Sequence, residues 1–146
     1  MTSQNKWFRV VLLVLRAVLG IIFVYAAWTK LSTPWELFAM SIDSYQLLPL
    51  TMVEFVARTL PWFELAVGLC VLAGIFLRTA AVATSLLLAV FFGLMVRAYA
   101  KGMEINCGCF GPGEVISWKT LLRDGSLLAA ALALACMSFL RCRKTV

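Results

Sequence analysis

The sequence contains no histidine and few charged residues. Only 14% of its 146 residues are Asp, Glu, Lys or Arg, whereas 63% are hydrophobic, and the mean hydropathy is +0.96. A soluble globular domain has about 25% charged residues, so this composition excludes that class and indicates a membrane protein. The chain has no recognisable linker, repeat or low-complexity tract, so we expect a single transmembrane domain over residues 1–146. Without histidine, no metal site can use imidazole as a ligand.

Four apolar runs are long enough to span a bilayer, which takes about 20 residues. They cover residues 10–28, 55–77, 80–98 and 118–140. The first run is longer than the roughly 7–15 residues of a signal-peptide core, so we interpret it as a retained anchor. The sequence therefore predicts an all-α fold, an integral membrane bundle of four spanning helices.

Capping patterns predict a short additional helix between the first two spans. Thr33-Pro34-Trp35-Glu36 has the hydroxyl, proline and glutamate found at helix starts. The apolar residues that follow recur at helical spacing, which is typical of a helix lying in the membrane interface. Thr51-Met52-Val53-Glu54 predicts a second capping box, at the start of the second spanning helix, and Pro61 is expected to kink that helix.

Lys and Arg are distributed unevenly between the two sides of the predicted bundle. One side has basic residues without acidic ones: Lys6, Arg9, Arg78, Arg141, Arg143 and Lys144. The other side carries Glu36, Asp43, Glu54, Glu104 and Glu114. Because cytoplasmic loops are rich in Lys and Arg, we predict a multi-pass protein of the plasma (inner) membrane with both termini in the cytoplasm. Part of the net charge of +6 therefore reflects topology, and we predict no nucleic-acid partner.

Cys107 and Cys109 lie in a turn-rich connection on the predicted extracytoplasmic side, where disulfides persist. A disulfide between them would close a loop of only three residues, and loop-closure stabilisation grows with loop size, so a structural role explains the pair poorly. The extended Cα atoms would be about 7 Å apart and a disulfide needs about 5.5 Å, so the backbone must bend at Gly108. Strained, exposed disulfides have the high potentials of catalytic pairs, and the pair therefore predicts redox chemistry.

Six ionisable residues fall in the outer halves of the spans: Lys30, Arg58, Glu64, Arg97, Arg123 and Asp124. Charges are costly in hydrocarbon, so we predict a polar pocket beneath the cysteines in which Glu64 or Asp124 passes protons. Four cations against two carboxylates predict a positive field that lowers a thiol pKa. The alternative is that the long cations reach the lipid head groups and that Arg58 forms an ordinary i,i+4 pair with Glu54.

The remaining cysteines are interpreted as structural. Cys70 and Cys136 lie deep in apolar spans, where free cysteine behaves as a small hydrophobic residue. Cys142 is predicted to face the reducing cytosol. We assign no role to Arg16.

Several short motifs, spread over nearly the whole chain, carry a family resemblance. They are Arg16 to Lys30 in the first span, Tyr45-Gln46-Leu47-Leu48-Pro49, Leu60-Pro61-Trp62-Phe63-Glu64-Leu65, Cys107-Gly108-Cys109-Phe110-Gly111, and Ser117-Trp118-Lys119 to Arg123-Asp124. Together they resemble the MauE branch of the DoxX-like membrane proteins, and Cys-Gly-Cys-Phe-Gly is the most specific of them. The resemblance implies thiol–disulfide chemistry with thioredoxin-like partners outside the cytoplasm, as in maturation of disulfide-rich methylamine dehydrogenase, with Cys107 and Cys109 reacting.

The sequence thus predicts a membrane thiol–disulfide oxidoreductase that exchanges electrons with a thioredoxin-like extracytoplasmic protein. A lipid quinone is the natural small carrier for a site bordered by hydrocarbon and cations. One alternative is a protein that binds or transports Cu(I) or Hg(II) through Cys107 and Cys109, because soft ions prefer sulfur. Another is a non-catalytic scaffold subunit. The residues alone do not select which cysteine attacks or the direction of electron flow.

Overall fold

The computed structural model describes residues 3–110 and 113–143, with the side chains of residues 6–110 and 113–140. These residues form five α-helices: α1 (Ser3–Ser32), α2 (Trp35–Asp43), α3 (Leu50–Ala73), α4 (Leu77–Ala100) and α5 (Trp118–Arg143). All except the short α2 are long and apolar enough to cross a membrane. The predicted all-α fold, with four spans and a short helix after the first, is confirmed, and the protein is a multi-pass membrane protein.

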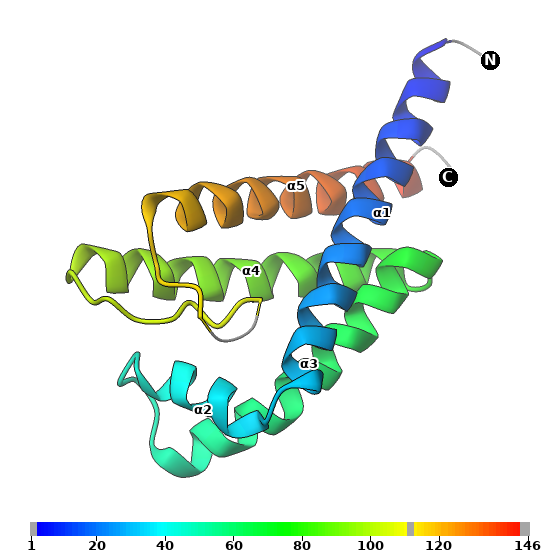
Figure 1. Cartoon of the computed structure of the whole chain (residues 1–146). Helices are drawn as coiled ribbons and strands as arrows, with labels where there is room; N and C mark the ends of the chain where they lie inside the picture. Colours follow the sequence, from blue (N-terminus) through cyan, green and yellow to red (C-terminus); the bar gives the residue numbers. More distant parts are fainter. Residues whose placement is uncertain (1–2, 111–112, 144–146) are drawn as a thin grey trace.

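The four long helices are arranged as two pairs, α1 with α3 and α4 with α5 (Figure 1). Both ends of the chain and the tight turn between α3 and α4 lie at one end of the molecule. At the opposite end, which we call the cysteine end, lie α2 and the connection between α4 and α5, residues 101–117. The two pairs diverge toward the cysteine end, and this divergence makes room for the site.

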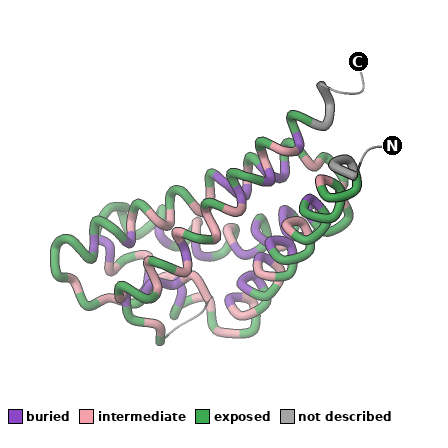
Figure 2. Tube along the Cα trace, turned by 90° about the horizontal axis from the view of Figure 1, so that it is seen from above, coloured by how far each residue is buried: buried purple, intermediate pink, exposed green. Residues whose placement is uncertain are grey.

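Small residues let α1 and α3 approach closely. A Cβ added to Gly68 would lie 3.0 Å from the Cβ of Phe23, and one added to Gly20 would collide with Leu72. Such close contacts are the usual means of helix association in membranes. Figure 2 shows buried positions along the inward sides of the helices. The core away from the cysteine end includes Leu12, Leu19, Phe23, Val67, Val71, Ala80, Ala81, Ala131 and Leu134.

Arg16 closes the end of α3 that lies away from the cysteines. Its guanidinium donates to the carbonyls of Val71 at 3.1 Å and Leu72 at 2.9 Å. The last carbonyls of a helix lack partners within the helix, so this contact satisfies groups that hydrocarbon would leave unpaired. Arg16 therefore has a structural role that its position in the sequence did not reveal.

The short helix α2 starts where predicted but without the predicted cap. Pro34 occupies the N-cap position, and no side chain caps the helix. The Thr33 hydroxyl instead donates to the carbonyls of Thr29 and Lys30 in the last turn of α1. The capping-box prediction was wrong because the hydroxyl residue stands one position before the N-cap, within reach of the preceding helix.

The second predicted capping box is also absent. The N-cap of α3 is Pro49, so the helix begins at Leu50, before the predicted span, and it has no side-chain cap. Glu54 pairs instead with Arg58 at 2.7 Å, as the i,i+4 alternative predicted. The helix continues through Pro61 to Ala73.

Candidate functional site

The connection between α4 and α5 folds back on itself and brings Cys107 next to Glu114. The amide of Ile116 donates to the carbonyl of Ile105 at 3.0 Å, and the amide of Cys107 donates to the carbonyl of Glu114 at 2.8 Å. An isolated antiparallel bridge between Asn106 and Val115 lies between these bonds. The chain therefore presents its cysteines from a short, hydrogen-bonded hairpin.

This hairpin rests on α2 and the residues that follow it. Gly108 has a φ of +71°, the bend that the spacing of the cysteines required, and a Cβ there would lie 3.2 Å from that of Ser41. The Tyr45 hydroxyl donates to the carbonyl of Cys107 at 3.3 Å. Burial, followed by the charges of the two cysteines and Asp124, raises the pKa of Tyr45 above its usual range, so this phenol keeps its proton.

Both thiols are free, and they interact with each other. A hydrogen bond from the Cys109 thiol lowers the pKa of Cys107 from 9.0 to about 7, against burial and the charges of Glu114 and Asp124. Donating that bond, together with burial, raises the pKa of Cys109 above its usual range. The pair is therefore poised as a thiolate at Cys107 and a thiol at Cys109, because one shared proton cannot stabilise both as anions.

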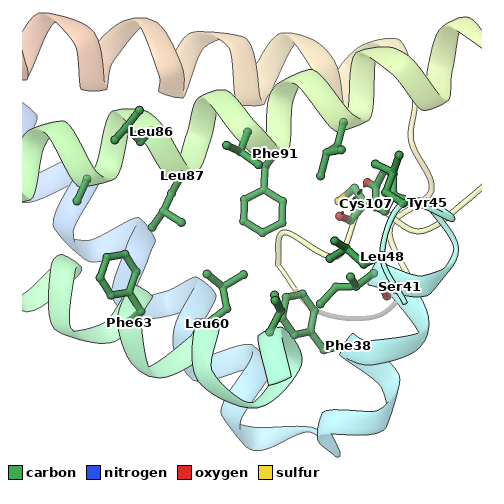
Figure 3. A pocket seen from close by; sticks show the side chains of 16 residues that line it. Phe38, Ser41, Tyr45, Leu48, Leu60, Phe63, Leu86, Leu87, Phe91 and Cys107 are labelled. Atoms are coloured by element: carbon green, nitrogen blue, oxygen red, sulfur yellow. Dashed lines mark hydrogen bonds between the residues drawn. The ribbon is translucent and has the colours of Figure 1, made fainter. Parts of the chain in front are cut away.

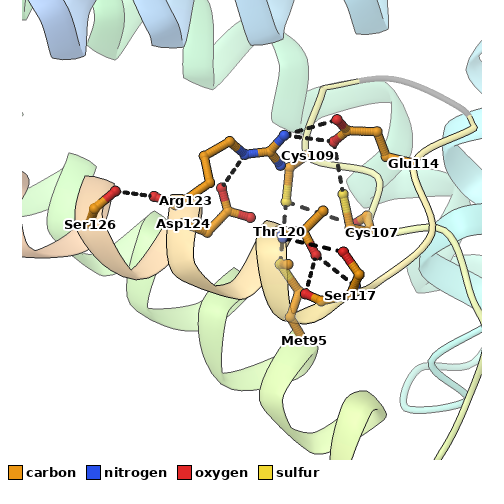
Figure 4. A network of polar contacts seen from close by, with 9 residues as sticks. All are labelled: Met95, Cys107, Cys109, Glu114, Ser117, Thr120, Arg123, Asp124 and Ser126. Carbon is orange, nitrogen blue, oxygen red and sulfur yellow. Dashed lines mark hydrogen bonds and ion pairs between the residues drawn. The ribbon is translucent and has the colours of Figure 1, made fainter.

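Arg123 of α5 ties the hairpin to the bundle (Figure 4). Its guanidinium donates to both carboxylate oxygens of Glu114 at 2.9 Å and to Oδ1 of Asp124 at 3.2 Å. The guanidinium also lies over the ring of Phe110, 4.5 Å from the centroid. Glu114 in turn contacts the Cys107 sulfur, with 3.7 Å between Oε2 and Sγ. Both bonds to Glu114 come from the same nitrogen, Nη1, and both are charge-assisted, so Arg123 holds the Glu114 carboxylate beside the Cys107 thiol.

A second ion pair lies beneath the cysteines, between α1 and α3. The Lys30 ammonium lies 2.9 Å and 2.7 Å from the two carboxylate oxygens of Glu64, and their side chains are 1% and 6% exposed. The ammonium also lies near the rings of Phe38 and Phe91, at 5.2 Å and 5.5 Å from their centroids. The charge of Lys30 slightly favours the Cys109 thiolate, the last of the influences on its pKa.

Four of the six charges predicted for the polar pocket lie near the cysteines, and two do not. Lys30, Glu64, Arg123 and Asp124 make the contacts described above. Arg58 is 56% exposed, paired with Glu54 and stacked on Trp35, so it lies outside the pocket. Arg97 is exposed near the end of α4. Each cation that reaches the pocket is matched by a carboxylate, so the low pKa of Cys107 comes from Cys109 rather than from the predicted positive field.

A small cavity connects Cys109 with both predicted proton carriers. Its volume is about 30 Å³, and Cys109, Glu64 and Asp124 are among its lining residues. A cavity needs at least about 10–15 Å³ to hold a water molecule. Within the described part of the chain, Oδ2 of the buried Asp124 has no hydrogen-bond partner. The cavity therefore places Cys109, Glu64 and Asp124 around a space that can hold a water molecule.

Comparison with known proteins agrees with the predicted family. Residues 8–137 match the family described as Methylamine utilisation protein MauE. The chain belongs to the MauE family. It is 36% identical over 128 residues to Methylamine utilization protein MauE of Paracoccus denitrificans, covering 86% of this chain and 68% of that protein. It is 38% identical over 108 residues to Protein TlpB of Flavobacterium psychrophilum, covering 66% of this chain but only 28% of that protein. No solved structure matches it.

Three residues of this MauE-family site were not predicted from the sequence: Glu114, Tyr45 and Met95. Glu114 was counted only as an acidic residue of one side, although its place across the glycine-rich turn from Cys107 could have suggested a hairpin partner. Tyr45 is named from the sequence only in the motif Tyr45-Gln46-Leu47-Leu48-Pro49, without a role at the site. Met95 gave no signal, yet its sulfur lies 3.8 Å from that of Cys109.

The other cysteines lie away from this site. Cys70 packs against the apolar core at the opposite end, and Cys136 is an exposed position of α5. The side chain of Cys142 lies outside the described residues. Among the described residues, no group of three or more His, Cys, Asp or Glu side chains is arranged to hold a metal ion.

Proposed function

We propose that this protein carries out thiol–disulfide exchange between the Cys107/Cys109 pair and a thioredoxin-like protein on the extracytoplasmic face of the membrane. The observation that supports this most directly is the contact between two free thiols, one with a pKa of about 7, at one end of a membrane bundle. The redox-associated role implied by the MauE resemblance points the same way. We also propose that the MauE family is a branch of the DoxX-like membrane proteins.

The exposures of the two cysteine residues support an order of events. Cys107 is 1% exposed, whereas Cys109 is only partly buried, so a protein thiolate reaches Cys109 first. Its attack breaks the Cys107–Cys109 bond, forms a mixed disulfide with Cys109 and releases Cys107 as a thiolate. A thiol of low pKa leaves readily, which favours this direction of attack. A second partner thiol then attacks the mixed disulfide, so the partner becomes oxidised and the pair is left as a dithiol.

Asp124 is the better candidate for passing the proton of Cys109. Both carboxylate oxygens of Glu64 are held by Lys30, whereas Oδ2 of Asp124 is unpaired within the described residues and Asp124 lines the cavity beside Cys109. Of the two carboxylates considered from the sequence, we therefore propose Asp124 as the proton acceptor and Glu64 as the fixed counter-ion of Lys30.

Charge asymmetry supports the proposed orientation in the plasma membrane. The basic residues Lys6, Arg9 and Arg78 lie toward the end opposite the cysteines, and acidic residues such as Glu36 and Glu104 lie toward the cysteine end. A membrane-impermeant thiol reagent applied to intact cells should then label the reduced Cys107/Cys109 pair and spare Cys142. Labelling of Cys142 alone would reverse the orientation.

Trapping the mixed disulfide tests the proposed exchange. In a Cys107→Ser variant, Cys109 can attack a thioredoxin whose reactive cysteine is held in a disulfide and whose second cysteine has been replaced. Its thiolate displaces the leaving thiol and cannot be resolved within the protein, so the mixed disulfide should accumulate. A Cys109→Ser variant should trap far less, because Cys107 is buried. Cys136→Ser, an exposed cysteine of α5, is the matched control and should exchange like the parent. Equal trapping by both single-cysteine variants would refute the order, and trapping by neither would refute the exchange.

One observation favours soft-metal binding as a second candidate function. The Met95 sulfur lies 3.8 Å from that of Cys109, which brings a thioether beside the two thiols. Three sulfur ligands suit Cu(I). In that case Met95→Leu should weaken Cu(I) binding at least tenfold while thioredoxin exchange is unchanged. A protein that neither exchanges disulfides nor retains Cu(I) would act as a scaffold.

A further inference from the structure

A large apolar groove runs between α2, α3 and α4 and ends at Cys107 (Figure 3). Its volume is about 530 Å³, within the range of roughly 300–1,000 Å³ typical of small-molecule sites. Leu60 and Phe63 line it from α3, and Leu86 and Val90 line it from α4. The groove therefore extends along two spanning helices and reaches one of the two reactive sulfurs.

The side walls of the groove indicate that its ligand enters from the membrane. Phe63 is 50% exposed, Leu86 62% and Val90 60%, and all three lie on helices that are long and apolar enough to cross a bilayer. Residues exposed at such positions meet lipid chains rather than water. The occupant must therefore have a substantial apolar portion and be dissolved in the bilayer.

The closed end of the groove is different from its walls. Cys107, Tyr45 and Ser41 line it there, and the two hydroxyl groups already donate to the carbonyls of Cys107 and Leu37, which leaves the Cys107 sulfur as the reactive group. Cys107 is 1% exposed, so a folded partner does not reach its sulfur directly, whereas a flat ring lying in the groove approaches it from the side. A lipid acyl chain would suit the walls equally well, but it has no group that reacts with a thiol at this end.

We propose that the groove binds a prenylated membrane quinone, with its ring at Cys107 and its isoprenoid chain between α3 and α4, and that this quinone oxidises the Cys107/Cys109 dithiol. The inference rests on the proposed function, because it supplies the step that regenerates the disulfide after exchange. The S–H bond of Cys109 breaks, the sulfur–sulfur bond forms, and the two carbonyl oxygens of the quinone each gain a hydrogen, one from Cys109 and one equal to the proton that Cys107 has already released to water. Two electrons and one proton leave the protein, and with the proton from water the quinone becomes a quinol.

The two sulfurs border different spaces, which suits this chemistry. Cys107 lines the groove, whereas Cys109 lines the small cavity that also contains Asp124. Leu87 and Phe91 line both spaces and therefore form the wall between them. The oxidant thus approaches one sulfur through hydrocarbon, while the proton of the other sulfur leaves through a separate small cavity that Glu64 and Asp124 line.

The test uses purified, fully reduced protein in detergent and decylubiquinone as the probe. Quinol formation is followed by absorbance, and free thiols are counted at each time point. We expect one quinol for each pair of thiols lost. Val90→Trp should fill the groove and raise the KM for decylubiquinone at least tenfold. Val82→Trp is the matched control, because Val82 is an exposed valine of the same helix that does not line the groove, and it should behave like the parent.

Disulfide exchange with reduced thioredoxin, measured on the same preparations, separates this inference from the function on which it rests. Normal exchange without thiol oxidation by decylubiquinone would overturn the quinone site and leave the exchange function intact. Failure of both reactions would overturn both. Equal KM values for the two tryptophan variants would place the quinone outside the groove. A photoreactive quinone that labels the groove gives a competition test. If phospholipid prevents the labelling and decylubiquinone does not, the groove is a lipid site instead.

Discussion

Removing either partner of the Lys30–Glu64 ion pair should destabilise the protein strongly, whereas removing both should be tolerated. The proposed changes are Glu64→Leu, Lys30→Met and the double variant. Each single change leaves one buried charge without its counter-ion, because the two side chains are 1% and 6% exposed. The double change leaves two apolar side chains of similar size in an apolar surrounding.

The size of the effect follows from the contacts of the pair. Breaking a buried salt bridge by removing one partner costs about 3–5 kcal/mol. After Glu64→Leu, Lys30 keeps the rings of Phe38 and Phe91, and each cation–π contact is worth roughly 0.5–2 kcal/mol. Those contacts already exist in the parent, so they limit the loss without replacing the carboxylate, and we expect about 3 kcal/mol. Replacing a buried pair by apolar residues is often neutral, so the double variant should fall within about 1 kcal/mol of the parent.

The assay is the free energy of unfolding in mixed micelles for the parent, both single variants and the double variant. The matched control is Glu54→Leu, because the Arg58–Glu54 pair has the same short contact of 2.7 Å but is 56% and 50% exposed. Exposed pairs contribute about 0–1 kcal/mol, so this variant should change little. Thioredoxin exchange should recover with stability in the double variant, since Asp124 is the proposed proton acceptor. A Glu64→Leu protein as stable as the parent would refute the reasoning.

Three further predictions concern the cysteine hairpin. The rate of Cys107 alkylation should rise with pH through a midpoint of about 7, because only the thiolate reacts, and Cys109→Ala should move this midpoint upward by removing the main cause of the low pKa. Gly108→Ala should cost about 1–2 kcal/mol, since the site has a φ of +71°, and faster alkylation of Cys107 would report the opening of the hairpin. Asp124→Asn should slow thioredoxin exchange at least tenfold, the loss expected for a proton acceptor, and an unchanged rate would assign the proton another route.

The presence of the spanning helices could be predicted from the sequence, because the hydropathy and length of a segment determine whether it crosses a membrane as a helix. The four spans and α2 follow from apolar runs and from the Thr33-Pro34 break, and no tertiary contact is needed to find them. Helix starts were predicted less well. Both capping boxes failed because Pro34 and Pro49 hold the N-cap positions, and a hydroxyl one or two residues away finds another acceptor or none.

The depth of a charge in the membrane could be read from the sequence, but the direction in which it points could not. All six predicted charges fall near the cysteine end, yet Arg58 and Arg97 face away from the pocket, while Lys30 and Glu64 meet only because α1 packs on α3. A difference of one or two positions turns a side chain by about 100–200° around a helix. Which charges meet is therefore decided by the close approach of the two helices at Gly20 and Gly68.

The division of labour between the two cysteines also depends on tertiary structure. In the sequence Cys107 and Cys109 are equivalent members of one motif, and no local pattern separates them. The hairpin bonds Cys107 to Glu114 and turns its sulfur toward a groove made by α2, α3 and α4, while Cys109 meets Met95 of α4 and the cavity beside Asp124. These surroundings bury the residue Cys107 and leave the residue Cys109 partly exposed. An asymmetric exchange, with a protein at Cys109 and a membrane-soluble oxidant at Cys107, follows from that difference rather than from the motif.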